Sequence, residues 1–113
     1  MTDISDKELK KHIQTVMIGG HENFLFLSGT KEKIRYLIDQ INPGASLLLK
    51  IMKSHADQTL MDKKEYADLM AFIAAYSSII AELKKDPNKY AQYIEQLNNN
   101  YENIKDLYVK LLL

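Results

Sequence analysis

Three histidines are the side chains with the most obvious potential for chemistry. His12 follows Glu8 by four residues, whereas metal sites in helical bundles use a glutamate and a histidine three residues apart. His21 begins the zinc pattern H-E-x-x-H, but Leu25 occupies the position of the second histidine. His55 falls in the expected last turn of a helix, where the helix dipole favours a positive imidazole. We interpret all three as structural residues and predict no metal site.

Other catalytic patterns are missing from the sequence. The glycines form neither a phosphate-binding loop nor a dinucleotide fingerprint, and the chain has no cysteine. No serine is paired with a base in a recognisable motif, and the carboxylates are spread singly among lysines. We therefore predict no catalytic residues, no cofactor and no enzymatic activity.

The charge balance limits the possible partners. Fifteen basic residues match fifteen acidic ones, so no long-range field attracts a nucleic acid or an acidic membrane. Arg35 is the only arginine, although arginine is the usual side chain for reading phosphates and base edges. We expect no nucleic-acid binding. Contact with a membrane surface is left open.

Localisation is predicted from the same composition. The absence of cysteine suits a reducing cytoplasm, and residues 1–12 lack the apolar core of a signal peptide. The most apolar window, residues 69–81, is too short and too often interrupted by serine to span a bilayer. We expect a cytoplasmic protein with no integral membrane segment.

The first half of the chain has helical periodicity interrupted by glycine and proline. Ser5 and Glu8 form a capping box for a first helix, which Gly19-Gly20 should end or kink. Residues 21–27 are too uniformly apolar to distinguish a short helix from an extended segment. Thr30 should cap a second helix that ends at residues 42–44, Asn-Pro-Gly. A third, largely buried helix should then run to about residue 54.

The second half of the chain predicts a helical hairpin. Asp62 and Glu65 should cap a fourth helix that runs to about residue 85, and Asp86-Pro87 should start a fifth. Apolar residues recur along both helices in alternating steps of three and four, which favours antiparallel packing of the coiled-coil type. The core should include Ile73, Ile80, Leu97 and Ile104.

The whole pattern predicts an all-α fold in a single domain, residues 1–113. We expect an up-and-down bundle of four to five helices with a C-terminal antiparallel helical hairpin. The fourth helix has a second apolar face, which should pack on the earlier helices. This face consists of Phe72, Ala75 and Ile79.

The polar groups of the hairpin should lie at its surface. Tyrosine recurs along both seams, and we expect the hydroxyls to emerge at the edge and reach water. Residues 98–100, three asparagines, should fall on the outer face. Four residues should lie beside the fifth-helix seam and not in it, and they are our candidates for partner binding: Tyr93, Leu107, Leu112 and Leu113.

These patterns favour a non-enzymatic helical module for protein–protein interaction. It would act as an adaptor, inhibitor, chaperone or immunity-type protein. It would dock through the apolar, tyrosine-rich face of the C-terminal helix, onto a partner protein or a second copy in a homodimer. The alternative is a bundle that binds a small molecule or acts as an enzyme at an unrecognised site, with His21, His55 or buried tyrosines around a pocket.

Overall fold

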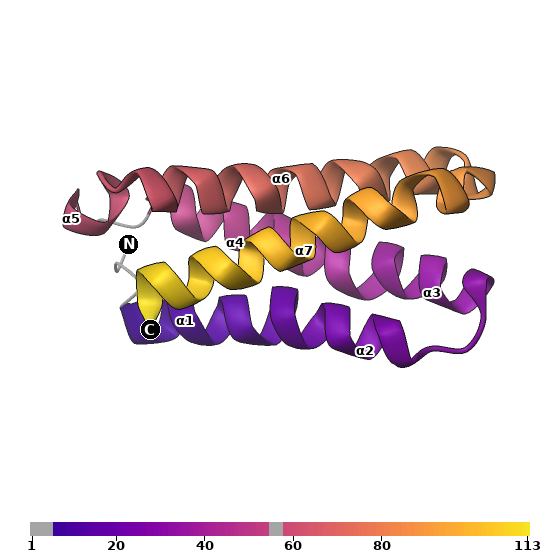
Figure 1. The fold of residues 1–113 in the computed structure, drawn as a ribbon, viewed down its shortest axis with the longest axis horizontal. Coiled ribbons are helices and arrows are strands. Elements are labelled where there is room, and N and C mark those ends of the chain that lie inside the picture. The colour runs from indigo at the N-terminus through magenta and orange to yellow at the C-terminus, as the bar shows by residue number, and fades with distance from the viewer. Residues whose placement is uncertain (1–5, 55–57) are drawn as a thin grey trace.

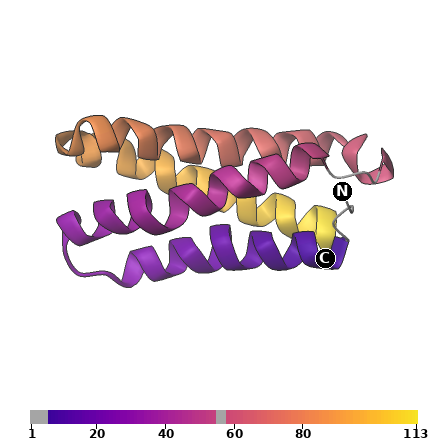
Figure 2. The same ribbon diagram turned by 180° about the vertical axis from the view of Figure 1, so that it is seen from behind.

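The structure is a computed structural model that describes residues 6–54 and 58–113, and within these residues every regular element is helical. The helices form an up-and-down bundle with extents of 42 × 26 × 22 Å (Figures 1 and 2). In chain order the elements are α1 (Asp6–Ile13), η1 (Gln14–Gly19), α2 (Gly20–Phe26), α3 (Thr30–Tyr36), η2 (Leu37–Ile41), α4 (Asn42–Ser54), α5 (Gln58–Met61), α6 (Lys64–Lys85), η3 (Pro87–Lys89) and α7 (Tyr90–Leu112). The predicted all-α bundle with a C-terminal hairpin is confirmed.

The first three elements form one continuous helix, the first rod, and α3, η2 and α4 form the second rod. Gly19-Gly20 was expected to end or kink the first helix, and it does not end it, because Gly19 (φ −63°, ψ −39°) and Gly20 (φ −60°, ψ −47°) have helical backbone angles. Asn42 is helical as well (φ −59°, ψ −45°), so the predicted break at residues 42–44 is wrong. Residues 21–27, which could have been a short helix or an extended segment, are helical up to Phe26, and Leu27 is extended.

Both rods contain a π-helical segment, η1 or η2, and η2 explains how the second rod tolerates a proline. Pro43 has no N–H group to donate, and in a regular α-helix its ring would collide with the carbonyl four residues earlier. The N–H of Asn42 donates to the carbonyl of Leu37, five residues back, so the helix is already wound in a wider turn there. The wider turn moves the carbonyls out of step with the ring, and the helix continues.

The glycine of the Asn-Pro-Gly segment serves close packing between the rods. A Cβ atom built on Gly44 would lie 2.8 Å from Cγ1 of Val16 in the first rod. Real Cβ atoms essentially never come so near another heavy atom, so any side chain at residue 44 would push the rods apart. Gly44 therefore allows the contact between the rods and does not terminate the helix.

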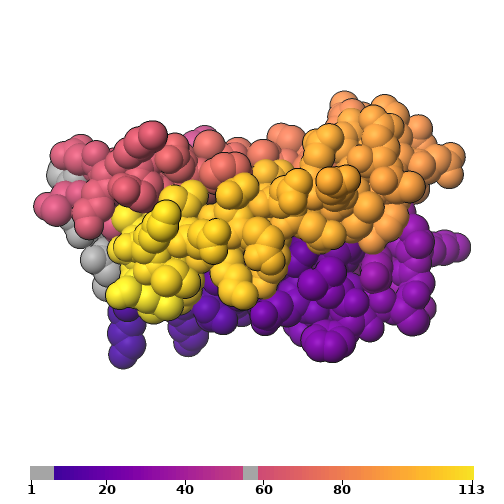
Figure 3. Space-filling view, in the orientation of Figure 1, coloured from indigo at the N-terminus to yellow at the C-terminus, as the bar shows by residue number. Residues whose placement is uncertain are grey.

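The C-terminal hairpin agrees with the prediction. The Asp86 carboxylate accepts a hydrogen bond from the Asn88 N–H (3.1 Å), and Pro87 occupies the first turn that follows. Helices α6 and α7 then pack against each other, and α7 runs diagonally across the bundle, so that its C-terminal end lies beside α1 (Figures 1 and 3). The four residues predicted for the core are all fully buried: Ile73, Ile80, Leu97 and Ile104.

The predicted helix caps are less accurate. Thr30 is the first residue of α3, while Gly29 is in the capping position and its carbonyl accepts from the Lys33 N–H (2.9 Å). Helix α6 begins at Lys64 with Lys63 before it, so Asp62 does not cap it. Ser5, half of the first predicted capping box, lies outside the described residues. The caps of α3 and α6 are thus each displaced by one residue from the predicted position, whereas Asp86 is the cap that the sequence predicted.

By length and composition alone, α6 could cross a membrane. The core helix of a soluble bundle passes the same criteria. In this fold α6 packs against α4 and α7. Its buried residues are Tyr66, Leu69, Ile73, Tyr76, Ile79, Ile80 and Leu83. They are the side chains expected of a central helix in a bundle.

Candidate functional site

His21 is the buried polar centre of the bundle. The ring lies in α2 with no exposed surface, in the second residue after the π-helical segment η1. Its Nδ1 atom is 2.7 Å from the hydroxyl of Tyr76 in α6, and its Nε2 atom is 3.0 Å from Oδ1 of Asn98 in α7. One side chain therefore connects the first rod to both helices of the hairpin.

Aromatic rings surround His21. The imidazole stacks on Tyr101, with ring centroids 4.1 Å apart and planes inclined by 17°. Tyr76 meets it edge-on at 5.6 Å and Phe24 is tilted at 5.2 Å. The Tyr101 hydroxyl donates to a carboxylate oxygen of Glu22 at 3.5 Å, a long hydrogen bond at the partly exposed edge of the cluster.

Burial determines the protonation state of this cluster. It lowers the pKa of His21 from 6.5 to about 4, and the hydrogen bond with Asn98 opposes the shift only in part. Burial likewise raises the pKa of Tyr76 above its usual value. At neutral pH both groups are uncharged. The Nε2–H group of His21 then donates to Asn98, and the Tyr76 hydroxyl donates to Nδ1, which assigns the tautomer from the two partners.

The geometry gives His21 a structural task. Both ring nitrogens are occupied, so neither has a lone pair available to a metal ion or a substrate. Within residues 6–54 and 58–113, no group of three His, Asp or Glu side chains is placed to hold a metal ion. A fully satisfied polar cluster specifies how the rods and the hairpin fit together, because any other fit would leave buried polar atoms unpaired.

The other histidines do not join this cluster. His12 is half-buried in α1 and takes part in none of the hydrogen bonds that define this cluster. His55 lies outside the described residues. The two histidines that the structure describes, His12 and His21, therefore do not form a common site.

Two expectations about the hairpin are wrong for particular residues, namely Asn98 and the hydroxyls of Tyr66 and Tyr76. Asn98 is half-buried and bonded to His21, although residues 98–100 were expected on the outer face. The Tyr66 and Tyr76 hydroxyls are buried and do not reach water; Tyr66 donates to the Met52 carbonyl at 2.7 Å. The first rod and α4 cover the edges of the seam, so these polar groups pair inside the protein. The need of a buried tyrosine for a partner was the one sequence signal that pointed to the cluster.

A groove lies between α6 and α7 on the outer surface of the hairpin. We call it the hairpin groove; it has a volume of about 550 Å³. Its lining residues are Ala75, Ser78, Ile79 and Glu82 from α6, and Tyr93, Gln96, Asn99 and Asn100 from α7. Its apolar part consists of Ala75, Ile79 and Tyr93, and amide and carboxylate groups surround it.

The hairpin groove corrects the expected packing of α6. Ala75 and Ile79 were predicted to face the earlier helices, but they lie beside α7. Ser77 occupies the side of α6 that faces the second rod, where its hydroxyl donates to Oδ1 of Asn42 at 2.6 Å. Successive helical residues are about 100° apart, so Ala75 and Ile79 fall on a different side from Ser77. The second apolar face of α6 is thus left partly uncovered.

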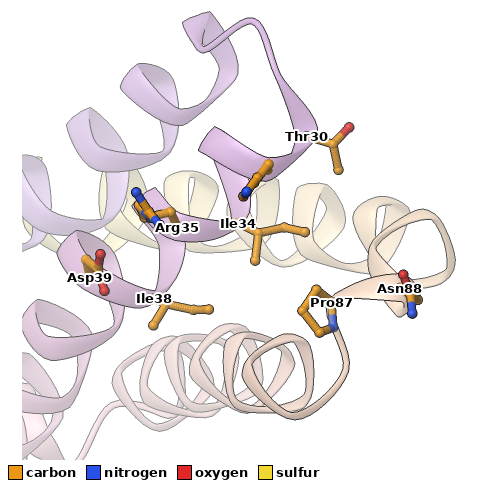
Figure 4. A pocket seen from close by; sticks show the side chains of 8 residues that line it. Thr30, Ile34, Arg35, Ile38, Asp39, Pro87 and Asn88 are labelled. Carbon is orange, nitrogen blue, oxygen red and sulfur yellow. The ribbon is translucent and has the colours of Figure 1, made fainter.

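A second groove, the end groove, lies where α3 and η2 pass the start of η3. It has a volume of about 570 Å³, and Figure 4 shows Ile34, Ile38 and Pro87 pointing into it. Thr30 and Asn88 lie at its rim, and Arg35 and Asp39 lie to one side (Figure 4). The hollow is apolar with polar groups around it.

The residues predicted to bind a partner are separated by the structure. Tyr93 lines the hairpin groove, and half-buried Leu107 follows it by 14 residues, which puts both on one side of α7. Leu112 is only 9% exposed, so the expectation that it lies beside the seam is wrong. It follows Ile104 by eight residues and shares its buried side. Leu113 is 75% exposed.

No known protein family matches the chain, and comparison with curated proteins and with solved structures gave no match either.

Proposed function

We propose that the protein is a non-enzymatic interaction module that binds a helix of a partner protein in the hairpin groove. The observation that carries the proposal is the apolar strip formed by Ala75, Ile79 and Tyr93 on the outside of the hairpin. Ile79 is 7% exposed, so the floor of the groove is already well packed and offers a fixed surface. Binding would not require the bundle to rearrange.

The chemistry of the groove suits an amphipathic helix. Such a helix places apolar side chains three, four and seven residues apart into a groove between two helices. Tyrosine is enriched at protein interfaces because its ring buries apolar area while its hydroxyl still reaches a polar group. The amides of Gln96, Asn99 and Asn100 offer donors and acceptors at the rim. Leu107 lies farther along the same side of α7, beyond the residues that line the groove.

The proposed absence of catalysis is supported by the His21 cluster. The buried histidine, the group best suited to acid–base chemistry, has both nitrogens paired, and neither groove is lined by it. The partner-binding role needs no such group.

The end groove favours a second candidate function, the binding of a small molecule. Its volume falls within the range of about 300–1,000 Å³ found for ligand sites, and its apolar hollow is flanked by Lys31, Arg35 and Asp39. Mass spectrometry of the natively purified protein distinguishes the candidates. A stoichiometric small molecule would favour the end groove, and a stoichiometric protein would favour the hairpin groove.

A pair of neighbouring alanines tests the hairpin groove. Ala75 lines it, whereas Ala74 is exposed on α6 and does not. Ala75→Arg should fill the groove with a charged chain and reduce capture of the partner from native lysate by at least about tenfold, a cost of about 1.4 kcal/mol. Ala74→Arg should capture as wild type does. Circular dichroism and thermal unfolding verify that both variants are folded.

Several outcomes decide the proposal. Equal capture by wild type and both variants would place the docking surface elsewhere. Sedimentation equilibrium adds a further distinction: a wild-type dimer that Ala75→Arg converts to a monomer would make the occupant a second copy of the chain. In that case the hairpin groove would be the docking site, but its occupant would be a second copy of the chain and not a separate partner protein.

A further inference from the structure

The end groove carries a row of charged side chains along one wall. Lys31, Arg35 and Asp39 line it at intervals of four residues, so they follow one side of α3 and η2 with one helical turn, ~6 Å, between neighbours. Two isoleucines of the adjacent row, together with Pro87, point into the hollow (Figure 4). The end groove therefore has an apolar floor beside a wall that is positive at its first two positions and negative at its third.

The three charges of this row are not neutralised by ion pairs within the bundle. Arg35 lies three residues after Glu32 and four before Asp39, which are spacings at which helical side chains of opposite charge often pair. In the part of the chain that the structure describes, neither carboxylate forms an ion pair with Arg35, and Lys31 has no ion pair either. All three side chains of the row are exposed. They can therefore bind groups of opposite charge on a ligand without first breaking an internal contact.

We propose that the end groove binds short apolar peptides whose two termini are free. The peptide carboxylate would lie at Lys31 and Arg35, the ammonium group at Asp39, and the apolar side chains over the floor of the groove. The inference rests on the end groove being a small-molecule site, which is the second candidate function, and it names the class of ligand. It is independent of the hairpin groove and of any partner bound there.

Charge and length favour this class over other small molecules. A fatty acid would pair with the two cations but would leave Asp39 unused, and a simple amine would meet two like charges beside its one partner. The row from Lys31 to Asp39 covers two helical turns, ~12 Å. An extended peptide of two or three residues spans about 7–10 Å, so its termini reach charges along this row, whereas a single amino acid carries both charges on one carbon. The groove volume of about 570 Å³ accommodates a ligand of this size.

Nuclear magnetic resonance titration of the isotope-labelled protein tests the ligand class. Leucyl-leucine, with both termini free, should shift the amide signals of residues 30–39 with a dissociation constant of about 1 mM, because each exposed charge pair contributes little. The signals of residues 75–82, at the hairpin groove, should stay in place. N-acetyl-leucyl-leucinamide has the same apolar side chains but neither charge, so it should bind at least about tenfold more weakly.

Three variants test the row of charges. Arg35→Gln and Asp39→Asn should each weaken the binding of leucyl-leucine by at least about threefold. Lys53→Gln, exposed in α4 and outside the end groove, is the matched control and should bind as wild type does. Circular dichroism verifies that all three variants are folded.

The titrations separate the peptide inference from the candidate function on which it rests. Equal binding of the free and blocked peptides, or binding that Asp39→Asn leaves unchanged, would overturn the peptide inference and keep the end groove as a small-molecule site. Shifts at residues 30–39 with octanoate but not with leucyl-leucine would do the same and make the ligand a simple anion. If neither peptide nor octanoate shifts these signals, both the inference and the small-molecule site are wrong.

Discussion

Lowering the pH tests the buried histidine cluster. In the folded protein the pKa of His21 is about 4, whereas an exposed histidine in the unfolded chain titrates near 6.5. Because the folded pKa is the lower one, His21 contributes stability that is present above pH 6.5. That stability is lost as the pH falls towards 4, since the unfolded chain then binds a proton that the folded protein resists.

The size of the loss follows from the difference in pKa. The two values imply that His21 protonation alone removes about 2 kcal/mol by pH 5 and about 3 kcal/mol by pH 4. A domain of this kind has about 5–15 kcal/mol of stability, so the loss is a large fraction of the total. Protonation would also place N–H on Nδ1, where the Tyr76 hydroxyl could no longer donate.

Urea unfolding at pH 7, 5 and 4 measures this loss, and a variant separates it from the titration of the carboxylates. His21→Gln has no titrating ring but retains donor and acceptor groups. Its stability should fall between pH 7 and 4 by about 3 kcal/mol less than that of wild type. His12→Gln, in the same rod but outside the cluster, should follow the wild-type curve. Parallel losses for wild type and His21→Gln would refute the assignment of His21 as a buried neutral group.

Two further predictions concern packing. Ile104→Ala should lower the free energy of unfolding in urea by about 2–5 kcal/mol, because Ile104 is fully buried. Val109→Ala, at a half-exposed position of α7, is the control and should lower it by ~0.5 kcal/mol at most. Similar losses for both variants would show that the seam is misplaced. Gly44→Ala should cost about 1–3 kcal/mol because its Cβ would lie 2.8 Å from Val16 Cγ1. Adding Val16→Ala to that variant should recover part of the loss, and strict additivity of the two changes would contradict the close approach.

Periodicity was sufficient to predict the hairpin. The spacing of Ile73 and Ile80, and of Leu97 and Ile104, depends on the geometry of one helix and the side it buries. Asp86-Pro87 was equally informative, because a capping carboxylate before proline has a local physical effect. These two features depend on one or two neighbouring turns and were predictable from the residues alone.

The continuity of the two rods could not be predicted in the same way. Glycine and proline usually interrupt helices, but the first rod continues through Gly19 and Gly20, where Gly20 is buried beside Ile41 of the second rod, and the second rod continues through Pro43 after the wider turn of η2. Neither the contact between the rods nor the wider turn is contained in the local sequence. The His21 cluster has the same origin, since it joins residues 55 and 77 positions apart in the sequence. No single segment contains the information that Asn98 faces His21.

Each π-helical segment sets the rotation between the helices before and after it, and therefore which side chains of the rod point into the core. A turn closed over five residues accommodates one residue more than an α-helical turn, and each residue of an α-helix rotates the next by about 100°. Removing one residue from η1 would restore a regular helix, but it would rotate α2 relative to α1. Either Leu9 and Ile13 or His21 and Phe24 would then turn out of the core. Residue number in this rod is thus constrained by the direction in which two groups of side chains must point, and insertions or deletions there should be tolerated far less well than substitutions at exposed positions.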